Sequence, residues 1–197
     1  MIREALNKPR GVDRPVIANF PVNADLCKRP DAFCYYENSQ ITPSLLTDFA
    51  DGFWRSVERP FSEDYLLLVL DECQIIFNAR SWQDKGRSGK GDSRLDWLEF
   101  LSQHRKYGYK VVLIAQSAKM IDNQFRMLID DEINSRKVDG MGMVGGLVGL
   151  ICRHRLFMRV HYLYQSNERL GMRMSIGRTA DMRMYDSYAR LRKVASG

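Results

Sequence analysis

The sequence has few of the residues that build disulfide-stapled or metal-centred proteins. Among its 197 residues are only four cysteines and three histidines, and no two cysteines have the CxxC spacing. No set of these side chains has the spacing of a structural zinc site, and Cys73 directly follows an apolar run that ends in two acids. We therefore expect reduced thiols, as in a cytosolic protein, and no zinc.

The sequence also lacks a signal peptide and a long hydrophobic run. Its first ten residues, MIREALNKPR, contain no apolar core segment. The longest uncharged run, residues 140–152, is rich in glycine and shorter than the ~20 residues that a membrane-spanning helix needs. We expect no transmembrane helix in this chain.

The overall composition is that of an ordinary globular protein. Apolar residues make up 45% and charged residues 27%, and the length suffices for one domain with a full core. The formal net charge of +6 suits nucleic acid, anionic lipid or nucleotide and does not choose among them. A mild excess of this kind is most often a solvated surface.

Apolar runs of strand length alternate with amphipathic helical stretches. In chain order they are strand 15–20, helix 43–54, strand 65–70, helix 96–107, strand 110–115 and helix 121–129. The runs YLLLVL at 65–70 and KVVLIA at 110–115 are unbroken, as in strands buried on both faces of a parallel sheet. The pattern predicts an α/β fold with a mainly parallel sheet flanked by helices.

We expect one domain in two parts. Residues 1–135 form its core, and residues 136–197 add a glycine-rich loop, an edge strand at 156–164 and a basic C-terminal stretch at 181–194. A glycine-rich basic loop is expected at 80–94, and residues 1–6 have helical composition.

The strand at 65–70 ends in Asp71 and Glu72, the pattern of a Walker B element. Ligands of open α/β sheets bind at the carboxyl ends of the strands, so this strand would present two carboxylates to a nucleotide. Asp71 would hold Mg²⁺, through water, and Glu72 would act as general base toward the attacking water. The alternative is a strand that simply ends in two acids as it leaves the core, and the motif alone does not separate the two.

Two further residues bear on the nucleotide interpretation, and the first of them favours it. Gln116 follows the second apolar strand, where many P-loop ATPases place a residue that senses the γ-phosphate; the alternative is a satisfied amide at a strand end. Arg105, near the end of the preceding helix, is a candidate arginine finger toward a neighbouring subunit. A basic residue that stabilises a helix C-terminus is the simpler interpretation of Arg105.

Several blocks together resemble one family. LVLDECQIIFNARSW, LEFLSQHRKYGYKVVLIAQ, MIDNQFRMLID, RKV and YDSY are similar to the zonula occludens toxin (Zot) family, which includes the gene I proteins of filamentous phages. The resemblance extends from about Val16 to Tyr188. It implies a P-loop NTPase-like domain of the RecA/ASCE type at the cytoplasmic face of the host inner membrane, followed in the family by a transmembrane helix and a periplasmic tail.

The resemblance also implies activity and partners. The family members are assembly ATPases that use ATP and Mg²⁺, act as homo-oligomers, and extrude virions with phage coat and assembly proteins and an outer-membrane channel. Single-stranded phage DNA is a further possible partner. The basic stretch around Arg183 and Arg190 would then lie near an anionic membrane surface.

The sequence departs from the family in one respect. The family opens with a strand and a GxxxxGK[ST] phosphate loop, and neither is present; residues 86–93 (GRSGKGDS) have the wrong spacing and position. We expect the missing strand to lie beside strand 65–70 in the family fold. Either the chain is a piece of an ATPase and hydrolyses ATP poorly alone, or it is an inactive scaffold that binds coat proteins, assembly proteins or packaging-signal DNA. A DNA-packaging or conjugation-type motor shares the fold and is a third possibility.

Overall fold

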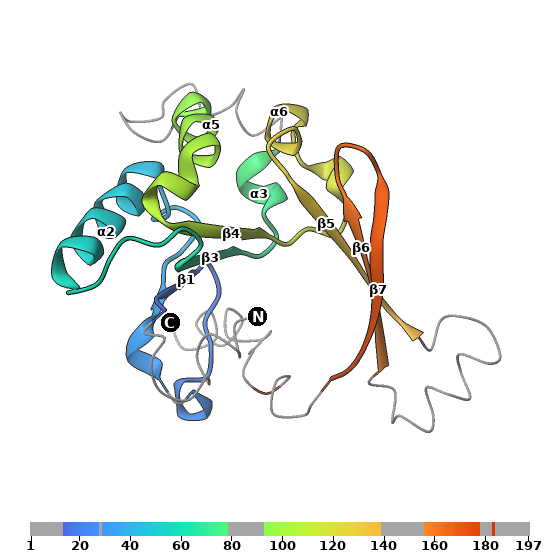
Figure 1. Cartoon of the computed structure of the whole chain (residues 1–197), viewed down its shortest axis with the longest axis horizontal. Helices are drawn as coiled ribbons and strands as arrows, with labels where there is room; N and C mark the ends of the chain where they lie inside the picture. Colours follow the sequence, from blue (N-terminus) through green and yellow to red (C-terminus); the bar gives the residue numbers. More distant parts are fainter. Residues whose placement is uncertain (1–13, 28, 79–92, 139–155, 178–182, 184–197) are drawn as a thin grey trace, which may run out of the picture. The chain divides into compact units, whose positions relative to one another are not determined.

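The computed structural model describes residues 14–27, 29–78, 93–138, 156–177 and 183. The chain divides into two units, Met1–Leu128 with Asp186–Gly197, and Ile129–Tyr185. The division falls after residue 128 and not after 135, because the segment that follows forms a sheet of its own (Figure 1).

A four-stranded parallel sheet forms the centre of the first unit. Its strands are β1 (Val16–Ala18), β2 (Phe33–Tyr35), β3 (Leu66–Leu70) and β4 (Tyr109–Leu113), in the order β2-β1-β3-β4. The predicted α/β architecture with a mainly parallel sheet is confirmed. The three-residue strand β2 was not predicted.

The first two predicted helices are confirmed. Thr42 is the N-cap of helix α2 (Pro43–Ser56), and its side chain accepts a hydrogen bond from the Leu45 N–H. Helix α5 (Arg94–Gln103) begins with a capping box between Ser93 and Asp96, and the 3-10 turn η3 (His104–Tyr107) continues it.

The helix predicted at 121–129 is confirmed only over its four central residues. They form the short helix α6 (Asn123–Arg126), and a separate 3-10 turn, η4 (Ala118–Met120), precedes it. Ser117 accepts a hydrogen bond from the Lys119 N–H and Asp122 from the Gln124 N–H, so each side chain starts a turn of its own. A third short helix, α3 (Gln74–Phe77), follows β3.

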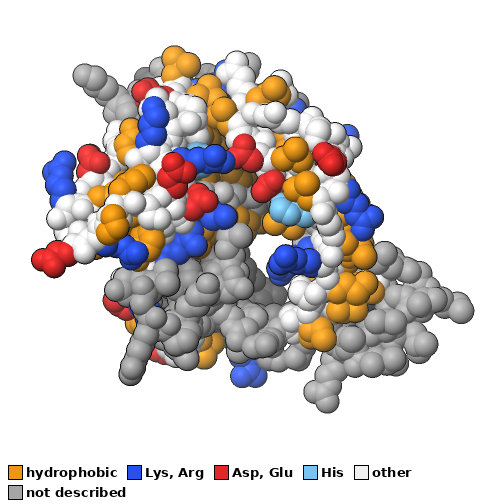
Figure 2. All heavy atoms as spheres, in the orientation of Figure 1, with side chains coloured by type: hydrophobic (Ala, Val, Ile, Leu, Met, Phe, Trp, Pro, Cys, Tyr) orange, Lys and Arg blue, Asp and Glu red, His pale blue; other side chains and the backbone are white. Residues whose placement is uncertain are grey.

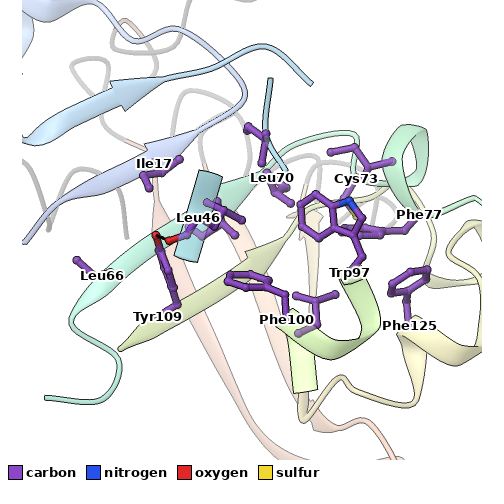
Figure 3. Packing of buried hydrophobic residues seen from close by; sticks show 14 of the residues in the cluster. Ile17, Leu46, Leu66, Leu70, Cys73, Phe77, Trp97, Phe100, Tyr109 and Phe125 are labelled. Carbon is purple, nitrogen blue, oxygen red and sulfur yellow. Dashed lines mark hydrogen bonds between the residues drawn. The ribbon is translucent and has the colours of Figure 1, made fainter. Parts of the chain in front are cut away.

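Aromatic side chains fill the space between the sheet and its helices (Figure 3). The rings of Phe77 and Trp97 meet edge to face at 5.1 Å, and those of Phe77 and Phe125 lie 4.7 Å apart. Tyr109 is fully buried, and its hydroxyl donates a 2.8 Å hydrogen bond to the Leu46 carbonyl of α2. This core fixes β3 and β4 against α2 and α5.

The two apolar strands differ in burial. Every residue of β3 is buried, as predicted for a strand covered on both faces. The same prediction for β4 is wrong: Tyr109 is buried, but the other four residues are only partly buried and Ile114 is 43% exposed. Strand β4 is the last in the described sheet, and this explains its exposure. Both edges of β3 are occupied, by β1 and β4, so a further strand has no place beside it and that expectation is also wrong.

The second unit contains a three-stranded antiparallel sheet. Strand β6 (Leu156–Leu163) lies between β5 (Asp131–Lys137) and β7 (Glu168–Ile176), and the predicted edge strand is therefore a central one. Exposed apolar side chains lie along β7, where Figure 2 shows them as orange spheres; they are Leu170, Met172, Met174 and Ile176.

Some predictions fall on residues that the structure does not describe. They are the helix at 1–6, most of the loop at 80–94, the run at 140–152 and, apart from residue 183, the basic stretch at 181–194. Among the helices that are described, none combines the length and the apolar character needed to cross a membrane.

Candidate functional site

Asp71 and Glu72 lie in a turn at the carboxyl end of β3. Both side chains are partly buried, and β3 pairs on both sides, so the turn projects from the middle of the described sheet. The predicted acidic pair is therefore held at the edge of the sheet where open α/β folds bind ligands. Its roles in magnesium binding and proton transfer remain predictions.

Glu72 has an unusual backbone conformation. Its φ is 49°, in the left-handed region that residues other than glycine rarely occupy. The Glu72 N–H donates to Asp71 Oδ1 at 2.9 Å, and the following Cys73 N–H donates to the Ile114 carbonyl at 3.0 Å. Such strained residues persist only where the surrounding contacts hold them, and they concentrate at functional sites.

Asn19 holds the acidic turn from the neighbouring strand. It follows β1, its exposed fraction is 1%, and its Oδ1 accepts a 2.7 Å hydrogen bond from the Asp71 N–H. Its Nδ2 donates to the Asp71 carbonyl and to Asn38 Oδ1, each at 2.7 Å. Sequence reasoning missed Asn19, although it is a polar residue at the end of an apolar strand, the signal that identified Gln116.

Gln74 contacts the second carboxylate. Its Nε2 donates a hydrogen bond to Glu72 Oε2, and the side chain is 7% exposed. Within the described part of the chain, Gln74 Oε1 is buried without a hydrogen-bond partner. The amide thus restrains the Glu72 carboxylate at an energetic cost, which buried unpaired polar atoms carry. No pattern in the sequence pointed to Gln74.

The thiol beside the acidic pair is buried and protonated near neutral pH. Cys73 is fully buried, and its burial, with the charges of Asp71 and Glu72, raises its pKa to about 12. A buried thiol with so high a pKa carries almost no thiolate near neutral pH and is therefore a poor nucleophile. Cys27 and Cys34 are likewise free thiols.

Gln116 lies at the same edge of the sheet as the acids. Leu70 and Leu113 are partners in the register of β3 and β4, and the chain continues from Leu113 to Gln116, whose side chain is exposed. Its placement beyond β4 agrees with the predicted position, and no hydrogen bond from Gln116 to the carboxylates is among the described contacts.

Arg105 lies at the other edge. It belongs to η3, which precedes β4, and its side chain is exposed. The five residues of β4 separate the two edges, a distance of roughly 16 Å at ~3.3 Å per residue. Arg105 and the acidic pair of one chain are therefore not brought together, and Arg105 stays a candidate only toward a neighbouring subunit.

The chain is similar to phage proteins and to one family model. The model of the family described as "Zonular occludens toxin (Zot)" matches residues 40–190. The Gene 1 protein of Salmonella phage IKe is 34% identical over 100 residues, which are 49% of this chain and 26% of that protein. The Gene 1 protein of Enterobacteria phage M13 is 39% identical over 88 residues, 43% of this chain and 23% of that protein. The match thus spans about a quarter of these relatives' length.

A solved structure shows a weaker likeness. It is the N-terminal domain of zonular occludens toxin from Neisseria meningitidis, with 14% identity and a TM-score of 0.44 over 88% of this chain and 80% of that one. The match of the family model to residues 40–190 covers well over half of the 197 residues. On this ground the chain belongs to the zonular occludens toxin (Zot) family.

Proposed function

We propose that this chain is the ATP-hydrolysing part of a filamentous-phage assembly protein that drives virion export through the host inner membrane. The observation that carries the proposal is the acidic turn, with Asp71 and Glu72 fixed at the carboxyl end of a buried central strand. Membership of the Zot family and the similarity to phage Gene 1 proteins support the assembly role.

The donor set suits magnesium bound with a nucleotide. Within the described residues no group of three His, Cys, Asp or Glu side chains is arranged to hold a metal ion, so an all-protein metal cage is not offered there. Mg²⁺ is commonly held by one or two carboxylates together with phosphate oxygens and water, and Asp71 would supply the protein ligand. When bound, the ion would neutralise charge on the phosphates.

Glu72 would accept the proton of the attacking water. Its fixed backbone places the carboxylate one residue beyond Asp71, and Gln74 restrains one of its oxygens. Gln116, at the same edge, would donate from its amide toward the phosphate. Asp71, Glu72 and Gln116 would thus act from two neighbouring strands.

The phosphate-binding loop would come from a strand beside β4. The edges of β3 are both occupied, whereas β4 pairs in the described sheet only with β3 and exposes part of its apolar side chains. An additional parallel strand there would cover Val111 and Val112 and place its own carboxyl end near Gln116. We expect the complete coding sequence to contain such a strand followed by GxxxxGK[ST].

The oligomer and its partners follow from the same proposal. The position of Arg105 requires a second subunit if it is to act on a nucleotide. Phage coat and assembly proteins are the expected protein partners, and the host inner membrane is the expected place of action. These statements concern the longer protein, of which this chain would be one part.

Release of virions tests the proposal. A phage whose own copy of the gene is inactivated is supplied with the complete protein, as wild type, Glu72→Gln or Glu63→Gln. Glu63 is an exposed acid before β3 and is the matched control. We expect Glu72→Gln to lower virion yield by about 100-fold or more, the scale of general-base loss, and Glu63→Gln to leave it unchanged.

The scaffold hypothesis predicts another result. If Glu72→Gln supports virion release as well as wild type while the protein is required, the chain binds assembly partners without hydrolysing ATP. That outcome would overturn the proposal.

A further inference from the structure

Asn19 is a buried residue whose side-chain oxygen and nitrogen both bind the backbone of Asp71. Both of its polar atoms contact the Asp71 peptide, with the Asp71 N–H donating to Oδ1 and Nδ2 donating to the Asp71 carbonyl, at 2.7 Å each. A side-chain amide that binds the N–H and C=O of one residue fixes that residue's backbone in orientation as well as position. The Asp71 backbone is therefore locked by a residue 52 positions away in the sequence.

The Asp71 backbone that Asn19 holds directly precedes Glu72, the residue with the left-handed conformation. Glu72 lies between two fixed peptide groups, that of Asp71, held by Asn19, and that of Cys73, whose N–H donates to the Ile114 carbonyl. Its φ of 49° is disfavoured for glutamate, so it would relax if either peptide were freed. Relaxation would turn the Glu72 side chain away from its present direction.

A third segment joins the same network. The second hydrogen atom of Asn19 Nδ2 is donated to Asn38 Oδ1 at 2.7 Å, and the neighbouring Tyr36 N–H donates to the Ala18 carbonyl at 3.1 Å. Asn38 lies in the turn after β2 and is partly buried. The segments that follow β1, β2 and β3 are thus tied together at Asn19.

We propose that Asn19 is the positioning residue of the acidic turn: it holds the Asp71 peptide and thereby the left-handed backbone of Glu72, and it couples both to Asn38. This role rests on the hydrolase function proposed above. It assigns Asn19 no contact with substrate. Asn38 acts more weakly and through Asn19, because it bonds to the Asn19 amide and not to the Asp71 backbone.

Amide hydrogen exchange of the 197-residue chain without nucleotide tests the proposal. We compare wild type with Asn19→Ala, Asn38→Ala and the control Asn134→Ala, an exposed asparagine of β5. Asn19→Ala should speed exchange of the Asp71 amide about tenfold or more, because that N–H loses its acceptor, while Leu68 within β3 changes by less than about twofold. Asn38→Ala should show the same selectivity with a smaller effect, and Asn134→Ala none.

Other exchange patterns overturn the proposal. Unchanged protection of Asp71 in Asn19→Ala shows that the turn holds itself. Equal acceleration at Asp71 and Leu68 shows that Asn19 supports the whole sheet and not the turn. If Asn19→Ala does not fold, Asn38→Ala decides: selective acceleration at Asp71 supports the coupling, and its absence refutes it.

Turnover by the complete protein provides a separate readout. If the proposal holds, Asn19→Ala lowers kcat for ATP by a larger factor than it raises KM, because Asp71 and Glu72 are misplaced and the phosphate loop is not. Absence of ATP turnover in the wild type would refute the hydrolase function, and the exchange pattern would still decide whether Asn19 positions the turn. The two failures are therefore distinguishable.

Discussion

The backbone of Glu72 is the feature of single-residue scale that separates this acidic turn from a strand that merely ends in two acids. An ordinary strand end requires no left-handed glutamate, and the conformation costs roughly 1–2 kcal/mol. The surrounding hydrogen bonds offset this cost, which is expected where function fixes a side chain. The strain has a measurable consequence for stability.

Glycine should be preferred over alanine at position 72. Because the two variants differ only in the Cβ methyl group, which disfavours the left-handed backbone, we expect Glu72→Gly to have a free energy of unfolding about 1 kcal/mol higher than Glu72→Ala. At Asp51, an exposed position in α2, the order should reverse by a similar amount. Urea unfolding of the four variants measures both differences. A preference for alanine at position 72 would show that the left-handed conformation is absent.

The Cys73 thiol predicts how stability changes at alkaline pH. Its pKa is raised from the ordinary 9.0 to about 12 in the folded protein, mainly by burial and further by Asp71 and Glu72. The folded protein favours the protonated thiol, so this group's contribution to stability is fully present while the pH is below the thiol pKa of the unfolded chain. That contribution is lost as the pH rises from about 9 to about 12. Burial also raises the pKa of Tyr109, which adds to the loss above pH 10.

Replacing the thiol should therefore weaken this pH dependence. Urea midpoints between pH 8 and pH 11 should fall less steeply for Cys73→Ala than for wild type, although the variant is less stable at pH 8 because it leaves a cavity. Cys27→Ala, at a partly exposed position, is the control. Parallel declines for wild type and Cys73→Ala would contradict the assigned burial.

The acids were predictable from sequence and the residues that hold them were not. Asp71 and Glu72 directly follow an unbroken apolar strand, which is a local pattern. Asn19 and Gln74 act through contacts that depend on strand order and on the direction of a buried amide, and neither is encoded locally. The sequence therefore identifies the two acidic residues but not the two amide side chains that hold them in place.

At the scale of elements, the connection between α5 and β4 depends on one glycine. Gly108 has a φ of 80°, and a Cβ built there would lie 2.7 Å from Trp54 Cζ2. Trp54 in turn donates from Nε1 to the Tyr107 carbonyl at 2.9 Å, so its ring has little freedom to move. This contact sets how α2 approaches the start of β4.

A pair of glycine-to-alanine substitutions tests that arrangement. Gly108→Ala should lower the free energy of unfolding by about 2 kcal/mol or more, because it adds left-handed strain and a clash with Trp54. Gly52→Ala, within α2 and with nothing within 4 Å of its Cβ, should raise it by up to about 1 kcal/mol. Thermal unfolding followed by circular dichroism gives both changes. Equal effects at the two positions would refute the close approach at Gly108.

Predictability among the elements follows the strength of the hydrophobic pattern. Strand β3 and helices α2 and α5 were predicted because burial on one or both faces determines their sequences. Strand β5, with the sequence DEINSRK, has almost no apolar periodicity, so pairing with β6 and not local preference makes it a strand. The burial of β4 was overestimated because an apolar run does not reveal which strand ends the sheet.

At the scale of the whole molecule, the chain combines a parallel α/β unit with an antiparallel sheet of its own. The candidate residues of the site lie in the first unit, and Arg105 lies at the edge of the parallel sheet away from the acids. One subunit therefore does not bring all four predicted residues together. If Arg105 acts, it acts across an interface between copies.

Mixing two inactive variants of the complete protein tests action in trans. Arg105→Ala and Glu72→Gln should each lose ATP turnover alone, and together they should regain part of it, because a mixed interface joins an intact Arg105 to an intact Glu72. Lys106→Ala, at the neighbouring exposed cation, is the matched control and should retain activity alone. No recovery on mixing, with oligomers formed, would remove Arg105 from the site.

The most direct test of the central claim is magnesium-dependent ATP turnover by the protein made from the complete coding sequence. The assay compares wild type, Glu72→Gln and the exposed control Glu63→Gln, with nucleotide binding measured in parallel. We expect Glu72→Gln to bind ATP but to turn it over about 100-fold to 10,000-fold more slowly, and Glu63→Gln to match wild type. Equal turnover by wild type and Glu72→Gln, or no turnover by wild type, would contradict the claim.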